Sequence, residues 1–166
     1  MKHSAVARHG LRIAGALAAW ACIASTCVAQ PLLPPAECVG EVSDTWLYVA
    51  VTDVRKGTGL VAFTIYDDDR SRFLVKRGSL AVMRVPAQLG ETRACIFLPR
   101  AGTYALAVYH DEDGNQAFNR SGLGLPNEGF GFSNNPTTLA GLPSFKAVRL
   151  SVPKPGLLTR IRLKYP

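Results

Sequence analysis

The chain has 166 residues, of which 48% are hydrophobic, and its 19 Lys and Arg against 12 Asp and Glu give a formal net charge of +7. This length fits one domain built around a single hydrophobic core. The basic excess does not indicate a nucleic-acid-binding protein, because part of it lies in an N-terminal segment that we expect to be removed.

Residues 1–29 have the organisation of a secretory signal peptide. A basic start is followed by an uncharged, Ala-rich run over residues 13–23 and by small residues ahead of a cleavage site after Ala29. The apolar run is shorter than the ~20 residues that a membrane-spanning helix needs. We therefore expect an exported protein, periplasmic or secreted, that does not span the membrane after signal cleavage. Cleavage removes three of the 19 basic residues and leaves 16 against 12 acidic ones, a net charge near +4; the three are Lys2, Arg8 and Arg12.

Two of the four cysteines, Cys38 and Cys95, remain after this cleavage. Two cysteines in an oxidising compartment most often pair. A bridge here would close a loop of roughly 58 residues, which the chain-entropy model values at up to ~4 kcal/mol. The alternative is two separate buried thiols, since the sequence does not test the geometry of a disulfide.

Residues 30–44 form a Pro-rich leader, and residues 45–166 carry the pattern of a β-sandwich domain. Short runs rich in β-branched and aromatic residues recur between clusters of Gly, Pro and Asp. We expect an all-β fold, a single antiparallel two-sheet sandwich of about seven strands with immunoglobulin-like or transthyretin-like architecture. The expected strands are Thr45–Val54, Gly59–Tyr66, Leu80–Pro86, Thr92–Leu98, Thr103–Tyr109, Phe145–Val152 and Leu158–Tyr165.

The segment between His110 and Ser144 is the longest one without a convincing strand. Structureless loops beyond ~15 residues are uncommon in compact domains. Apolar side chains give this segment anchors of its own, so we expect one long ordered loop packed over an end of the sandwich. The anchors are Phe118, Leu123, Leu125, Phe130, Phe132 and Leu139.

The start of this loop, HDEDGN, spaces oxygen-bearing side chains as the first half of a calcium loop does. The second half departs from that pattern, since Gln116 replaces the usual Gly and Gly122 replaces the bidentate Glu. A Ca²⁺ site built on this half pattern would be weak, with a Kd of ~10⁻⁴–10⁻³ M. The alternative is a turn in which Asp111 and Asn115 bond their own backbone. The candidate ligands are Asp111, Asp113, Asn115 and, from later in the loop, Glu128.

A second acidic run, Asp67-Asp68-Asp69, follows the second expected strand. In an antiparallel sandwich the loops after the second and fifth strands lie at opposite ends. We therefore expect this run to form a solvated turn that does not join the acidic loop.

His110 is the only histidine that remains after signal cleavage. A Ser-His-Asp or Cys-His mechanism would have to use it, because no other side chain supplies a base near neutral pH. No G-x-S-x-G motif is present. The alternative is a strand-end residue that hydrogen-bonds the loop.

The stretch EGFGFSNN offers aromatic rings beside amide groups, a combination that suits sugars or peptides. The alternative is that its rings fill the end of the core while its glycines let the backbone turn. The residues proposed for such a surface are His110, Phe130, Phe132, Asn134 and Asn135.

The last expected strand alternates apolar residues with Arg160, Arg162 and Lys164. Such alternation is typical of a strand with one solvated face. The basic face would attract anionic envelope polymers, or it is simply solvated.

The segments GTYALAVYHDEDGN, GLGLPNEGFGFSNN and GLPSF resemble a family of exported bacterial proteins, the domain-of-unknown-function family 2141. The likeness extends more weakly from Trp46 to Tyr165. It implies a β-sandwich and export, but no established activity. Members commonly have Gly and Asp where this chain has Gln116 and Asn119, so the resemblance implies a fuller calcium pattern in relatives.

Together these patterns predict a non-catalytic binding or accessory module of the cell envelope, with a peptide or carbohydrate as partner. Ca²⁺ is the one cofactor that the patterns indicate. The alternative function is an envelope hydrolase that uses His110 with the loop carboxylates.

Overall fold

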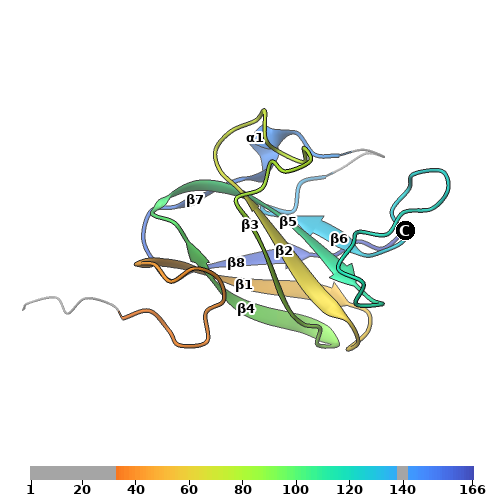
Figure 1. Ribbon diagram of the computed structural model, residues 1–166, viewed down its shortest axis with the longest axis horizontal. Helices are drawn as coiled ribbons and strands as arrows, with labels where there is room; N and C mark the ends of the chain where they lie inside the picture. The colour runs from red at the N-terminus through yellow and green to blue at the C-terminus, as the bar shows by residue number, and fades with distance from the viewer. Residues whose placement is uncertain (1–32, 138–141) are drawn as a thin grey trace, which may run out of the picture. The chain divides into compact units, whose positions relative to one another are not determined.

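A computed structural model describes residues 33–137 and 142–166 (Figure 1). The predicted signal peptide lies outside the described residues, as does the predicted loop anchor Leu139. Within the described ranges, no helix has the length and hydrophobicity that crossing a membrane requires. The elements in chain order are β1 (Thr45–Val54), β2 (Leu60–Tyr66), β3 (Ala81–Pro86), β4 (Gly90–Leu98), β5 (Gly102–Asp111), β6 (Phe130–Phe132), α1 (Phe145–Val148), β7 (Arg149–Val152) and β8 (Leu157–Arg162).

The strands form two sheets, and the predicted all-β sandwich is confirmed. One sheet has the order β4-β1-β8; the other has the order β3-β2-β5-β6, with β7 also paired to β5. Every pair is antiparallel except β1 with β8, which is parallel. The expectation of a wholly antiparallel sandwich is therefore wrong at β8. The chain passes from β7 in one sheet to β8 in the other, so a crossover rather than a hairpin sets the direction of β8.

One hydrophobic core fills the space between the sheets, and alternate residues of the strands supply it. The predicted two-faced last strand is confirmed, because Ile161 and Leu163 are buried in the core while Arg160 and Arg162 are exposed. The largest buried members of this core include Leu47, Phe63, Ile65, Ile96, Leu98, Leu106 and Ile161.

A second, smaller cluster covers the outer face of the five-stranded sheet, where Ala105 and Ala107 alternate with the core-facing residues of β5. The short helix α1 packs there, so the strand predicted over residues 145–152 is wrong for the first four residues and confirmed for the last four, which form β7. Phe145 and Val148 both contact the second cluster. A helical turn brings residues i and i+3 to one face, whereas a strand would send them to opposite faces.

β6 lies inside the segment that was predicted to contain no strand. Phe130 exchanges two backbone hydrogen bonds with Lys164, at 3.0 and 2.8 Å, so the edges of the two sheets meet here. Gly131 allows this approach, because a Cβ at this position would lie 2.5 Å from the carbonyl oxygen of Arg162. The Phe-Gly-Phe alternation of β6 thus turns two rings toward the second cluster and a bare backbone toward β8.

The predicted disulfide between Cys38 and Cys95 is present and spans 57 positions of the sequence. It ties the leader to β4. Val39 strengthens this attachment, since its N–H donates to the carbonyl of Cys95 at 2.8 Å and its carbonyl accepts from Phe97 at 3.0 Å.

Candidate functional site

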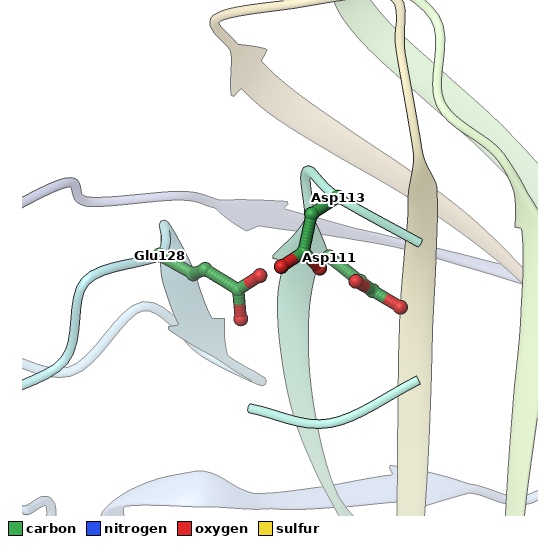
Figure 2. A group of neighbouring side chains, drawn as sticks. All are labelled: Asp111, Asp113 and Glu128. Atoms are coloured by element: carbon green, nitrogen blue, oxygen red, sulfur yellow. The ribbon is translucent and has the colours of Figure 1, made fainter. Parts of the chain in front are cut away.

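Three carboxylates converge between the end of β5 and the start of β6. Asp111 is the last residue of β5, Asp113 follows in the turn, and Glu128 stands two positions before β6. One carboxylate oxygen of each residue lies within 4.8 Å of one from each of the others. Figure 2 shows the carboxylates of Asp113 and Glu128 directed toward each other, with that of Asp111 beside Asp113. Three of the four predicted metal ligands therefore meet at one point.

The fold buries two of these three groups. Asp111 is fully buried and Glu128 is 4% exposed, while Asp113 is exposed to solvent. Asp111 is covered from one side by the β1–β2 turn, where a Cβ on Gly59 would collide with the carbonyl oxygen of Asp111. A buried carboxylate is costly unless it is hydrogen-bonded or paired with a cation.

Backbone amides of the turn supply hydrogen bonds to Asp111. Its two oxygens accept from the N–H groups of Asn115 at 3.1 Å and Gln116 at 2.8 Å. Gln116 has a φ of 64°, in the left-handed region that glycine adopts without strain. This backbone conformation explains the Gly that the family resemblance implies at position 116.

Asn115 takes part in the turn through both ends of its amide. Its Oδ1 accepts from the N–H of Ala117 at 2.7 Å, and its Nδ2 donates to Asp113 at 2.9 Å. The side-chain-to-backbone turn that the sequence left as the alternative is thus present. The oxygen of Asn115 is directed to the backbone rather than to the three carboxylates.

Asn119 links the acidic residues, although it was not among the predicted site residues. Its Nδ2 donates to Asp113 at 2.9 Å and to Glu128 at 3.4 Å, and its backbone N–H donates to Glu128 at 3.0 Å. The signal that identifies it in the sequence is its place at position 9 of a calcium loop counted from Asp111.

The cluster carries negative charge without a cationic partner among the described residues. Two basic side chains of the β1–β2 turn, Arg55 and Lys56, form ion pairs with Glu112 instead. Burial opposes ionisation of Glu112, but hydrogen bonds from Arg55 and Lys56 outweigh it and lower the pKa of its carboxyl. Glu112 therefore ties the acidic turn to the β1–β2 turn and does not join the three carboxylates.

The environment separates the pKa values of two members of the cluster. Burial raises the pKa of Glu128, and the nearby charges of Asp111 and Asp113 add to this rise against hydrogen bonds from two backbone amides. The pKa of Asp113 is lowered, mainly by the N–H of Asn115. A cation among these oxygens would relieve the penalty on Glu128.

His110 is fully buried, and both of its ring nitrogens have partners. Nε2 lies 2.9 Å from the carbonyl oxygen of Thr58, and Nδ1 lies 2.8 Å from the hydroxyl of Tyr165. A carbonyl only accepts, so Nε2 carries a proton, and the hydroxyl of Tyr165 is placed to donate to Nδ1. His110 therefore holds the end of β5. Its ring bonds the β1–β2 turn and Tyr165, whereas the alternative to a catalytic role expected a bond to the long loop.

The amides of Asn134 and Asn135 are bonded within the protein. Asn134 donates to the carbonyl of Arg149 at 2.7 Å, and Asn135 bonds the backbone of β8 through both ends of its amide. Phe132 is buried and Phe130 is half-buried, and both contact the second cluster. Of the predicted ligand-binding surface, Asn134 and Asn135 are exposed but have amides bonded to the backbone, and Phe130 is partly exposed.

The second acidic run lies at the opposite end of the five-stranded sheet, as the strand order predicted. Leu60 pairs with Asp111 and Tyr66 with Ala105, so the end of β2 is remote from the end of β5. Asp68 forms an ion pair with Arg149 there.

The fold and the site define a small β-sandwich protein with a carboxylate cluster at one end of its larger sheet. The chain belongs to the family described as "Uncharacterized protein conserved in bacteria (DUF2141)", whose model matches residues 49–157. The matched segment runs from β1 to the first residue of β8 and includes the three carboxylates. Neither a curated protein nor a solved structure matches the chain.

Proposed function

We propose that the protein is an exported, non-catalytic binding or accessory module of the cell envelope whose loop over residues 110–135 binds Ca²⁺ weakly. The observation that carries this proposal is the convergence of Asp111, Asp113 and Glu128 within 4.8 Å, two of them buried, with no cationic partner among the described residues. Hard oxygen ligands of this kind suit Ca²⁺.

The remaining ligands would come from the amides around the carboxylates. Asn119 turns its Nδ2 toward Asp113 and Glu128, and rotation of that amide by half a turn would present its oxygen instead. Three carboxylates, one amide oxygen and water give the six to eight ligands that Ca²⁺ takes. Zn²⁺ fits less well, because the one histidine beside the cluster, His110, has both ring nitrogens engaged.

Two observations support export. Residues 1–29 have the organisation of a signal peptide. The Cys38–Cys95 disulfide is the kind of bond that persists in oxidising compartments such as the periplasm.

The same geometry favours a binding module over the alternative hydrolase. For His110 to act as a general base, one of its ring nitrogens must be free to reach the substrate, and both nitrogens of the buried ring are engaged. The carboxylate of Glu112 is engaged with Arg55 and Lys56. Non-catalytic binding is therefore the role that the described residues support best.

Thermal unfolding in 1 mM Ca²⁺ and in chelator tests the proposal. A Kd of ~0.1 mM adds about 1.4 kcal/mol to the free energy of unfolding at that concentration, and this raises the Tm by several degrees. The Asp113→Asn variant should lose the shift, because this exposed carboxylate contributes to the cluster. Asp44→Asn, an exposed acid in the leader, is the matched control. A wild-type Tm that Ca²⁺ leaves unchanged up to 10 mM would contradict the proposal.

A further inference from the structure

A groove of about 430 Å³ lies along the junction of β6 and β8. Its lining combines apolar groups with a row of cations. The apolar part includes Phe130, Gly131 and Pro136, and the cations are Arg160, Arg162 and Lys164.

The three cations stand on one face of the chain because they occupy alternate positions in and just after β8. Successive members are separated by about 6.6 Å along an extended chain. Arg162 lies 3.3 Å from Asp53, and both groups are largely exposed. Arg160 and Lys164 are exposed and form no ion pair with any described residue, so the groove keeps a positive charge.

The backbone along this groove is already hydrogen-bonded. Asn135 bonds the carbonyl of Arg160 and the N–H of Arg162 through its side chain. The backbone of Phe130 bonds both the N–H and the carbonyl of Lys164. An extended peptide therefore has no free edge on which to add a strand. A ligand must be held by the side chains.

Phe130 gives the groove a fixed aromatic surface. Its ring packs edge-on against Phe118 and Phe132, with centroid separations of 6.0 Å in both cases, and remains partly exposed. A ring held in this way loses little conformational freedom when a ligand packs on it. Sugar rings present apolar C–H faces to such a surface and carry their charged groups at the rim.

We propose that this groove binds a linear acidic polysaccharide of the uronic-acid type. Carboxylates of the polymer pair with Arg160 and Lys164, and a sugar ring packs against Phe130. The proposal gives a partner class to the binding role proposed above. It does not depend on the calcium site, and measurements in chelator keep the two apart, because Ca²⁺ itself binds polyuronates.

Binding of fluorescently labelled oligogalacturonate to the purified protein, in chelator and at low salt, tests the groove. The double variant Arg160→Gln/Lys164→Gln should bind roughly five- to tenfold more weakly, since two exposed ion pairs are lost. Added salt should weaken wild-type binding by screening these charges. The matched control is Lys76→Gln/Arg77→Gln, which removes the same charge from the exposed β2–β3 connection and should stay within about twofold of wild type.

A second set of binding measurements distinguishes a glycan ligand from an acidic peptide ligand. Polyglutamate at equal carboxylate concentration should bind more weakly than oligogalacturonate. Phe130→Leu should weaken oligogalacturonate several-fold and leave polyglutamate unchanged, with a thermal melt to verify folding. Undetectable oligogalacturonate binding, equal loss in the Lys76/Arg77 control, or polyglutamate binding as tight as the glycan would each overturn the proposal.

Discussion

The hydroxyl of Tyr165 lies 2.8 Å from Nδ1 of His110, and this contact joins the C-terminal end of the chain to the end of β5. Burial raises the pKa of Tyr165, so its hydroxyl stays protonated and donates to the ring. The same oxygen accepts from the N–H of Arg55 at 3.1 Å. The acidic turn that follows His110 therefore starts from a strand end that two other segments, the C-terminal one and the β1–β2 turn, hold in place.

Removing this hydroxyl should destabilise the protein. Tyr165→Phe leaves Nδ1 of the buried His110 without a donor, which costs roughly 1–2 kcal/mol and lowers the Tm by several degrees. Urea unfolding followed by fluorescence measures the difference. Tyr48→Phe is the control, since Tyr48 is half-buried and its hydroxyl bonds no described residue. Equal stability of Tyr165→Phe and wild type would argue against this role of the contact.

The approach of β6 to β8 makes Gly131 sensitive to any side chain. In Gly131→Ala the new Cβ meets the carbonyl oxygen of Arg162 at 2.5 Å and Cγ2 of Ile161 at 2.9 Å. We expect a loss of about 2–3 kcal/mol, as for other overpacked sites, measured by chemical denaturation. At Gly122 a Cβ meets nothing within 4 Å, so Gly122→Ala should be near neutral. A neutral Gly131→Ala would show that the two strands separate easily.

Restoring the acid that the family resemblance implies at position 119 should strengthen Ca²⁺ binding. Asn119→Asp replaces the donor between Asp113 and Glu128 with a fourth carboxylate, so the calcium-free variant loses hydrogen bonds and gains repulsion. We expect a lower Tm in chelator and a Kd for Ca²⁺ at least tenfold lower by calorimetry, because affinity follows ligand charge. Asn127→Asp adds the same charge at an exposed position of the same loop and serves as the control. Equal affinities in the two variants would place the ion elsewhere.

The buried carboxyl of Glu128 should give a measurable pH dependence in chelator. Its pKa is raised in the folded protein above the ordinary 4.5, so below pH 4.5 the folded and unfolded states both carry a protonated group. As pH rises from 4.5 through the raised value, the wild type loses stability relative to Glu128→Gln, which stays neutral. The difference in unfolding free energy should therefore move in favour of the variant with rising pH, and 1 mM Ca²⁺ should suppress this trend. A difference that does not change between pH 4 and 7 would refute the shift.

Local patterns in the sequence predict much of the fold. The β1 run was predicted over Thr45–Val54 and is observed over the same residues. The alternation around Ile161 fixed which side of the last strand is buried, since successive side chains of a strand point to opposite faces. The spacing of Asp111 and Asp113 also marked the acidic turn, because it depends only on residues close in sequence.

The remaining features depend on contacts between distant segments. The three-residue strand β6 is too short to give a periodic pattern, and it forms through pairing with β5 and a bridge from Phe130 to Lys164. The parallel direction of β8 follows from the crossover between the sheets, which no local run records. Asn119 and Glu128 join the acidic turn only when the loop folds back on β5.

The sequence by itself determined most of the strand pattern and the residue types of the acidic turn, since each rests on chemistry within a short stretch of chain. Only the tertiary structure decided that His110 is bonded at both nitrogens, that Asn135 is held by β8, and that Arg160 and Lys164 face a groove beside Phe130. The physical reason is that burial and hydrogen-bond partners arise from packing between segments far apart in the chain. Those partners decide whether a polar side chain supports the fold or remains free to bind.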